Sequence, residues 1–199
     1  MNEIPRQPKT RPTTQAAEGI PRLRWTLAEF ERLAELGIFT EEDRIELIGG
    51  ELVPMSPKGN RHEVVRDELM NWFIGCLPKG VRLSSEIGWG PDATAYAEPD
   101  LLIYPRAFKG ISVPGENTLL VIEVADSSWR VDTTAKASLY ARLGVRDYWV
   151  VNARTLVTRI YRGPSINGFA SAVDVPPNEA LLPLLIASCA VKLVDLDMA

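Results

Sequence analysis

Three short segments in the second half of the chain most constrain its fold, because each is apolar at nearly every position. Residues 101–104, 119–124 and 147–151 read LLIY, LLVIEV and DYWVV. Continuous apolar runs of this length are typical of strands that other elements cover on both faces. A helical pattern separates the second run from the third, and this order forms a parallel crossover. We therefore predict an α/β fold with a mixed central sheet.

Two of these runs carry a carboxylate, which is costly to bury without a compensating charge. Asp100 stands at the head of the first run, and Glu123 lies inside the second. Side chains alternate between the faces of a strand, so the two acids can converge if these strands pair. Such oxygen ligands suit Mg²⁺ or Mn²⁺, which would polarise a scissile phosphate and activate water. The alternative is a structural pair of carboxylates bonded to backbone groups or to arginine.

Lys136 lies on the predicted helix between the second and third runs. It precedes Leu139 and Tyr140 by one turn, so it belongs to the stripe that faces the sheet. We predict that it orients the attacking water and stabilises developing phosphate charge, or that it is a structural partner of the acids. Asp132, four residues earlier, could pair with it locally.

The boundaries of that helix follow from capping signals. Asp132 or Thr133 is expected to begin it and Gly144 to end it, and Ala135 is expected on the apolar stripe. A further strand is predicted over residues 155–161. Beyond it we expect a loop, and finally a strand-like end with the sequence VKLVDL.

The first half of the chain predicts a helix and a hairpin. Thr26 and Glu29 form a capping-box pattern before a helix that ends at Gly37. Two short strands follow, with a turn at Gly49 and Gly50. An apolar stripe typical of a second helix comes after this hairpin.

Length and composition indicate one globular domain. We assign residues 22–199 to it and expect residues 1–21, which lack periodicity, to form a disordered tail. The net charge of −4 provides no overall basic surface for coating nucleic acid. Cys76 and Cys189 lie far apart in sequence and indicate neither a zinc site nor a disulfide framework. With no signal segment and no bilayer-spanning stretch, we expect a cytoplasmic protein without a membrane partner.

Several motifs follow one another in a fixed order along the chain: ELIGGEL, a histidine that opens a helix, EPDLLIY, LVIEVADSS, a helical lysine and YARLGVRDYWVVN. Together they resemble the Uma2 (Uma-two) family, which is described as restriction endonucleases of the PD-(D/E)XK superfamily. The resemblance runs from about Trp25 to about Tyr161 and implies a restriction-endonuclease-like fold, with a central sheet flanked by helices. It also implies phosphodiester hydrolysis with a divalent metal.

The superfamily motif can be carried over with one departure. The proline–aspartate pair is Pro99 and Asp100, and the second acid is Glu123. The superfamily's lysine normally stands two residues after the second acid, where this chain has Ala125. The resemblance assigns its role to Lys136 on the following helix.

Two residues outside this motif also match family positions. Glu46 matches an early acid and is expected to assist as a further ligand. It lies between Ile45 and Leu47, so it should point away from the face that those two bury. His62 is the only histidine and stands in the first turn of a predicted helix. A lone histidine cannot form a histidine-rich metal site, and a capping or surface histidine is the favoured interpretation.

The leading hypothesis is a metal-dependent DNA endonuclease. Asp100 and Glu123 would hold Mg²⁺ or Mn²⁺, Lys136 would position the water, and Glu46 would assist. The SSWR loop, residues 127–130, could contact the phosphate backbone. Two alternatives stay open: a catalytically inactive nuclease-fold module that binds nucleic acid or protein, and an enzyme that hydrolyses another anionic substrate. The sequence also leaves a homodimer open.

Overall fold

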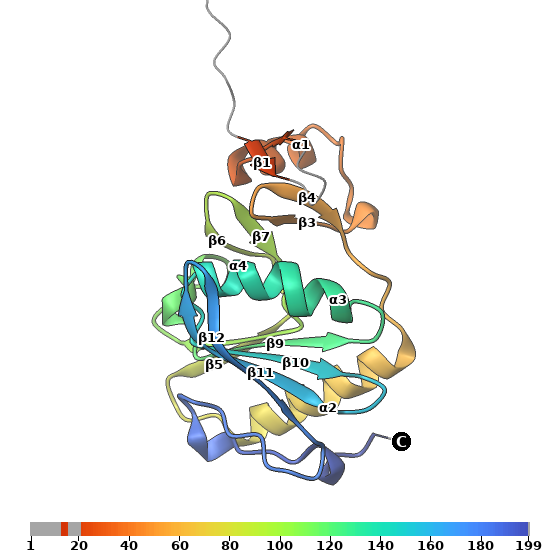
Figure 1. Cartoon of the computed structure of the whole chain (residues 1–199), viewed down its shortest axis with the longest axis vertical. Coiled ribbons are helices and arrows are strands. Elements are labelled where there is room, and N and C mark those ends of the chain that lie inside the picture. The colour runs from red at the N-terminus through yellow and green to blue at the C-terminus, as the bar shows by residue number, and fades with distance from the viewer. Residues whose placement is uncertain (1–12, 16–20, 199) are drawn as a thin grey trace, which may run out of the picture.

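A six-stranded mixed sheet forms the centre of the molecule in the computed structural model, which describes residues 13–15 and 21–198 (Figure 1). Strands β9 and β10 run parallel, whereas the other neighbouring strands are antiparallel. The mixed α/β fold is therefore confirmed. In spatial order the strands are β12 (Gly168–Val175), β11 (Thr158–Ser165), β10 (Asp147–Asn152), β9 (Leu120–Ala125), β8 (Leu101–Pro105) and β5 (Val81–Ser85).

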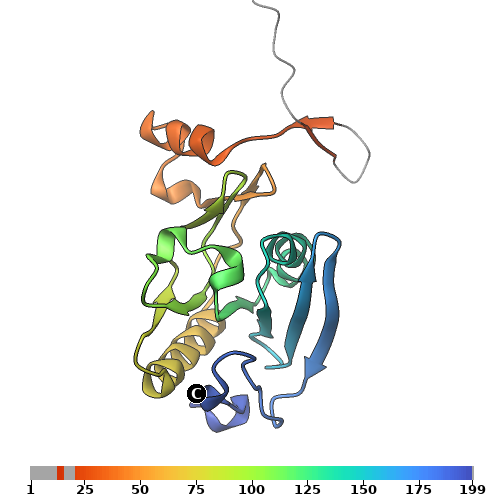
Figure 2. The same cartoon turned by 90° about the vertical axis from the view of Figure 1, so that its left-hand side faces the viewer.

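Helices cover both faces of this sheet, which explains why its central strands are continuously apolar. Helix α2 (Asn60–Cys76) packs on one face, and the crossover helix lies on the other, seen nearly end-on in Figure 2. Leu101 and Ile122 point into the core beneath α2. Their neighbours Leu102 and Val121 point into the core beneath the crossover helix. Alternate residues of each strand thus fill two separate apolar layers.

The crossover helix begins earlier than expected. It consists of α3 (Trp129–Val131), a π-helical turn (Asp132–Lys136) and α4 (Ala137–Arg142). The expected start at Asp132 or Thr133 is therefore wrong, whereas Gly144 does end the helix, with φ of 79°. Ala135 is exposed and does not face the sheet. A π-helical turn holds more residues than an α-helical turn, so the stripe predicted from α-helical spacing shifts there.

A smaller four-stranded sheet lies beyond the crossover helix in Figure 1, in the order β4-β3-β7-β6. The predicted hairpin is confirmed as β3 (Ile45–Ile48) and β4 (Glu51–Pro54). The remaining strands are β7 (Ala95–Ala97) and β6 (Trp89–Asp92). The capping box of Thr26 and Glu29 also forms, and it begins helix α1 (Leu27–Glu35).

The C-terminal part differs from the expected loop and strand. Strand β11 continues to Ser165, turns, and returns as β12, so these residues form a long hairpin. The final segment forms an isolated bridge between Leu181 and Val191 and a 3₁₀ turn (Leu193–Asp195) in place of a strand. Most β12 residues are exposed, and such a strand carries no apolar run that sequence patterning detects.

Cys76 and Cys189 form a disulfide, although their sequence spacing indicated no disulfide framework. The bond joins the C-terminal end of α2 to a 3₁₀ turn (Ala187–Cys189) in the last part of the chain. Sequence spacing could not reveal this pairing, because 113 residues separate the two positions. Their proximity depends on the completed fold.

Residues 13–15 of the expected N-terminal tail form a strand. Strand β1 (Thr13–Gln15) pairs with β2 (Pro21–Leu23) in an antiparallel ribbon. The other residues of the expected tail, 1–12 and 16–20, lie outside the described residues. Within the described residues, no helix has both the length and the apolar composition needed to cross a membrane.

Candidate functional site

The pairing of β8 with β9 brings the two predicted acids together. The strands are antiparallel and Leu101 lies opposite Ile122, so Asp100 and Glu123 follow as the next facing positions. Each of these residues is only 3% exposed. The backbone N–H of Val124 donates to Oδ2 of Asp100 at 2.7 Å. This bond fixes one carboxylate against the backbone of the strand that carries the other.

Lys136 reaches the acids from the crossover helix. Its Nζ lies 3.0 Å from Oε1 of Glu123 and 3.0 Å from Oε1 of Glu46. Oδ1 of Asp132 lies 3.9 Å from the same ammonium group. The structure therefore gathers Glu46, Glu123 and Lys136 although they come from three separate elements. The side chain of Glu46 lies on the opposite face of β3 from that of the buried Leu47. It is buried as well, because that face meets this site.

The π-helical turn positions Lys136, and hydroxyl groups satisfy the backbone of that turn. Thr133 and Thr134 donate from their side chains to the carbonyls four residues earlier. Tyr148 donates to the carbonyl of Asp132 at 2.9 Å, and Tyr161 donates to the carbonyl of Thr133 at 3.1 Å. Carbonyl groups displaced from α-helical bonding need such partners when buried. The tyrosines of β10 and β11 thus fix the turn relative to the sheet.

His62 is a buried residue of the site, so its interpretation as a capping or surface histidine is wrong. It is 5% exposed, and its Nε2 lies 3.0 Å from Oδ2 of Asp100. Because a carboxylate can only accept, Nε2 is the donor in this bond. Helix α2 presents its first turn to the end of β8, and only the tertiary structure reveals that contact.

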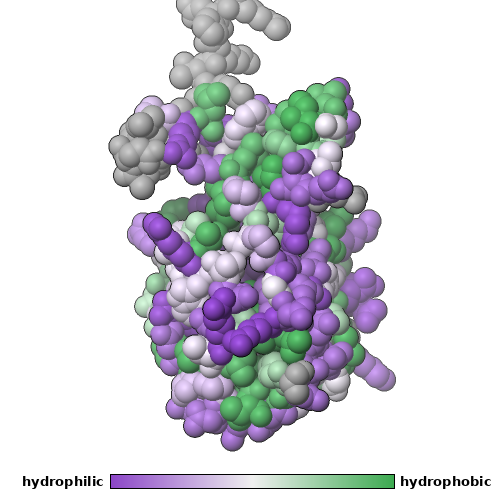
Figure 3. Space-filling model, turned by 90° about the vertical axis from the view of Figure 1, so that its right-hand side faces the viewer, coloured by the Kyte–Doolittle hydropathy of each residue, from purple (hydrophilic) through white to green (hydrophobic). Residues whose placement is uncertain are grey.

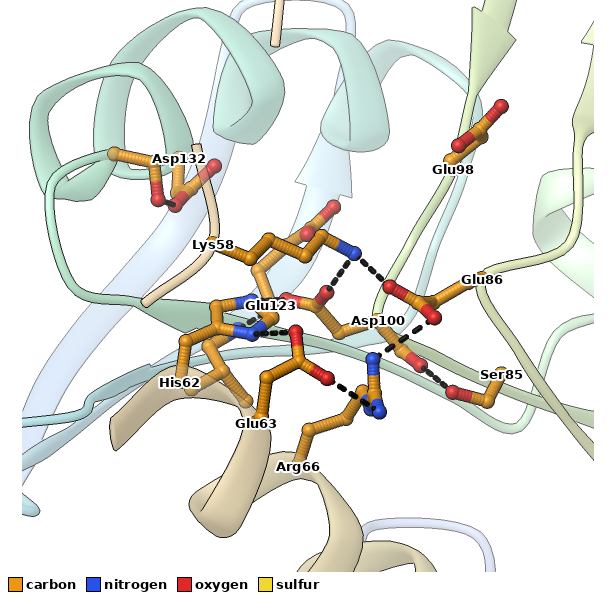
Figure 4. A network of polar contacts seen from close by, with 12 residues as sticks. Lys58, His62, Glu63, Arg66, Ser85, Glu86, Glu98, Asp100, Glu123 and Asp132 are labelled. Carbon is orange, nitrogen blue, oxygen red and sulfur yellow. Dashed lines mark hydrogen bonds and ion pairs between the residues drawn. The ribbon is translucent and has the colours of Figure 1, made fainter. Parts of the chain in front are cut away.

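Lys58 is a site residue that sequence reasoning missed. Its ammonium group donates to Oδ1 of Asp100 at 3.1 Å and also pairs with Glu86 (Figure 4). Arg66 of α2 contacts the other oxygen of Glu86 at 2.8 Å. Lys58 stands in the loop before α2, where no local pattern marks it. A chain of alternating charges therefore extends from Asp100 to the molecular surface.

Tyr140 is a further residue whose role was missed. Its hydroxyl group donates to Oε1 of Glu123 at 2.8 Å, and its side chain is fully buried. It follows Lys136 by four residues, so both lie on one face of the helix. That spacing was a usable signal, although an aromatic residue in an apolar stripe usually serves packing alone.

The electrostatic environment shifts the pKa values of Asp100 and Glu123 in opposite directions. Burial alone would raise the pKa of Asp100, but His62, Lys58 and the Val124 amide lower it to about 2. Burial raises the pKa of Glu123 well above its usual value, and neighbouring acids add to this effect while Lys136 opposes it. Asp100 is therefore the more acidic member of the pair.

A small cavity of about 50 Å³ opens among these residues, enough for an ion or a few waters. Ser127 and Ser128 of the predicted loop line it together with Asp126. The other two residues of that loop, Trp129 and Arg130, belong to α3, so the loop is shorter than expected.

The acids at this cavity fit a hard divalent cation. The hydrogen bonds that Glu123 and Glu46 accept all end on Oε1, so among the described residues Oε2 of each carries none. The described residues contain no ready-made group of three or more His, Cys, Asp or Glu ligands. Mg²⁺ commonly takes only one or two carboxylates and completes its shell with water and phosphate. Glu123 and Glu46 supply that number of open oxygens, whereas each oxygen of Asp100 already accepts at least one hydrogen bond.

Asp132 predicts a measurable dependence of stability on pH. Burial raises its pKa from 3.8 to about 6. Because the folded chain binds this proton more tightly, the group favours folding below about pH 4 and loses that contribution as the pH rises to about 6. Asp132→Asn should therefore flatten this fall in the free energy of unfolding, measured by urea denaturation across the range. The exposed Asp195→Asn variant should keep the parental slope, and an unchanged slope in Asp132→Asn would contradict the prediction.

Comparison with known proteins agrees with this architecture. No curated protein matches the chain. The crystal structure of a putative nuclease belonging to DUF820 from Anabaena variabilis is similar, with a TM-score of 0.66 and 16% sequence identity. The match covers 85% of this chain and 96% of the other. At that identity the likeness concerns the fold. The family model Uma2, described as "Putative restriction endonuclease", matches residues 27–193, and the chain therefore belongs to the Uma2 family.

Proposed function

We propose that the chain is a metal-dependent nuclease that hydrolyses phosphodiester bonds in DNA. The observation that carries this proposal is the convergence of buried Asp100 and Glu123 at one cavity, with Lys136 bonded to Glu123 at 3.0 Å. Membership of a family described as "Putative restriction endonuclease" supports the same chemistry. Burying this many charged groups is costly and favours a functional reason for retaining them.

Each residue can be given a role in that reaction. Asp100 and Glu123 would hold Mg²⁺ or Mn²⁺, and the ion would polarise the phosphate and acidify a water. Lys136 provides a fixed positive charge beside Glu123, suited to orienting the water and stabilising charge on the phosphate. Glu46 holds the lysine from its other side. Tyr140 and His62 orient the carboxylates through their hydrogen bonds.

A second candidate function is a nuclease-fold module that binds nucleic acid or protein without cleaving it. One observation favours it: Asp100 already accepts hydrogen bonds from Lys58, His62 and the Val124 amide. A carboxylate compensated in this way needs no metal ion for its charge. Metal-independent binding of DNA without cleavage would support this candidate over the nuclease.

Plasmid cleavage tests the nuclease directly. Purified protein should nick supercoiled DNA with Mg²⁺ or Mn²⁺ and stop when EDTA removes the metal. Asp100→Asn and Glu123→Gln should each reduce the rate by about 10²-fold or more, the scale of losing one electrostatic group at a reacting centre. Nicked circles would indicate cutting of one strand, and linear product would indicate cutting of both, as expected from paired copies.

The control for this assay is Glu179→Gln, a change of the same kind at an exposed position. It should cleave at the parental rate. Equal nicking by the parent, Asp100→Asn and Glu123→Gln would show that a contaminating nuclease produces the signal and would remove the assignment.

A further inference from the structure

A second, larger hollow lies directly beside the carboxylate cavity. Its volume is about 630 Å³, within the range of small-molecule sites. Glu98 lines both spaces, and Glu86, which pairs with the Asp100 partner Lys58, lines the larger one. The hollow is formed by α1, the segment after it and β7. Apolar side chains gather at this end of the molecule and also at the opposite end (Figure 3). A molecule in this hollow therefore lies next to any group that is bound at Asp100 and Glu123.

Aromatic rings form one wall of this hollow. The ring centroid of Phe30 lies 6.0 Å from that of Phe39 and 5.2 Å from that of Tyr96. Phe30 is buried, at 8% exposure, and packs against both of the other rings. Phe39 and Tyr96 are half-buried, so each retains accessible ring surface. A flat ring can stack on such a wall.

The backbone around the hollow is strained at two positions. Arg44 and Glu86, both lining residues, have φ values of 41° and 51°. Residues other than glycine rarely adopt this left-handed conformation, and such strain concentrates at ligand sites held by the surrounding structure. This observation is independent of the hollow's volume and aromatic lining.

The charged groups of the hollow are mainly acidic and favour hydrogen-bond donors. Asp43, Glu86 and Glu98 line it with three carboxylates against one guanidinium, that of Arg44, so the net negative lining disfavours phosphate and suits N–H groups. The side chain of Glu98 accepts from the hydroxyl group of Tyr96 at 3.2 Å. Its backbone N–H donates to Oε1 of Glu46 at 2.9 Å, which links the hollow to the Lys136 cluster. The fitting occupant is therefore an uncharged flat ring that carries N–H groups.

We propose that this hollow, here called the base pocket, binds one nucleobase of the substrate, turned out of its stack beside the scissile phosphate. The base stacks on Phe39 and directs its amino group toward Glu98. This inference rests on the proposed nuclease function and narrows its substrate to strands that can expose a base near the cut. Unstacked bases are typically held in this way, by aromatic faces and by hydrogen bonds to their edges.

The base pocket can be tested with a double-mutant cycle in which one change is made in the protein and the other in the DNA substrate. The substrate is a DNA duplex whose cleavage position has been mapped, with an abasic nucleotide placed at each position flanking the cut. Phe39→Ala should lower kcat/KM on intact DNA by about tenfold or more, the loss expected for one base–aromatic stack. At one flanking position the abasic substrate should lower the parental value by a similar factor. Phe39→Ala should lose nothing further on that substrate, because the two changes remove the same contact.

Two control variants separate stacking from folding. Phe39→Tyr keeps the ring and should retain near-parental activity. Leu36→Ala removes an apolar side chain that is 57% exposed and does not line the hollow, so it should leave kcat/KM unchanged. Circular dichroism of Phe39→Ala confirms that the variant is folded.

The outcomes distinguish this inference from the nuclease proposal. The base pocket alone is overturned if the parental protein cleaves DNA and the two losses in kcat/KM, from Phe39→Ala and from the abasic nucleotide, multiply independently at every position. The same independence together with an altered sedimentation coefficient for Phe39→Ala would assign the hollow to a contact between two copies. No cleavage of any DNA by the parental protein with either metal would overturn the nuclease, and the base pocket with it.

Discussion

Replacing Lys136 with methionine is expected to lower the free energy of unfolding by about 3–5 kcal/mol at pH 8, the usual cost of removing one partner of a buried ion pair. Glu123 and Glu46 would both lose the ammonium group that lies 3.0 Å from each. The variant should also lose nuclease activity, because no other ammonium group contacts Glu123 among the described residues.

The same variant should recover part of its stability at pH 5. Burial already raises the pKa of Glu123, and loss of Lys136, which opposes that shift, should raise it further. The folded variant would then bind more protons than the unfolded chain, so its free energy of unfolding should fall as the pH rises. Urea denaturation followed by circular dichroism at both pH values measures this difference.

Lys192→Met provides the matched control, because Lys192 is exposed and the substitution is identical. Its free energy of unfolding should change by no more than about 0.5 kcal/mol, as is usual for surface positions. A loss in Lys136→Met of similar size, or one that is equal at both pH values, would contradict the view that this lysine compensates the buried acids.

Reducing the disulfide between Cys76 and Cys189 is expected to lower the free energy of unfolding by about 2–4 kcal/mol. The bond spans 113 residues, so it restricts a large part of the unfolded chain. It also ties the last segment of the chain to α2, against which Cys189 is fully buried. Urea denaturation with and without a thiol reductant measures the effect.

A double Cys76→Ala, Cys189→Ala variant controls for effects of the reductant itself. It should denature at the lower urea concentration and should not respond to reductant. If the parental midpoint is the same under both conditions, the bond does not contribute to stability. A clear contribution of the bond to stability would argue against the expected cytoplasmic location, because the cytosol keeps most thiols reduced.

The placement of the acids was predictable because it depends on a local rule. Side chains alternate along a strand, and the apolar runs identified β8 and β9 before their pairing was known. The register in which Leu101 faces Ile122 then brings Asp100 opposite Glu123. Helical spacing predicted only that Lys136 faces the sheet and left open whether it reaches the acids. The structure gives it contacts with both Glu123 and Glu46.

The partners of Asp100 were not predictable in the same way. His62 and Lys58 come from 38 and 42 residues earlier in the chain, and their contacts arise only when α2 packs under the sheet. Strand β12 was missed for a different reason. Most of its side chains are exposed, so neither an apolar run nor a clear alternation marks it.

The π-helical turn at Asp132–Lys136 holds one residue more than a regular turn and still keeps both of its ends on the face that meets the acids. Deleting one residue from within the turn would leave a regular helix and every residue of the site present. Asp132 would then lie three residues before Lys136, and residues three or four apart are neighbours on a helix. Loss of one residue here is therefore compatible with the same alignment of acids and lysine, so relatives of different length in this turn can share one site.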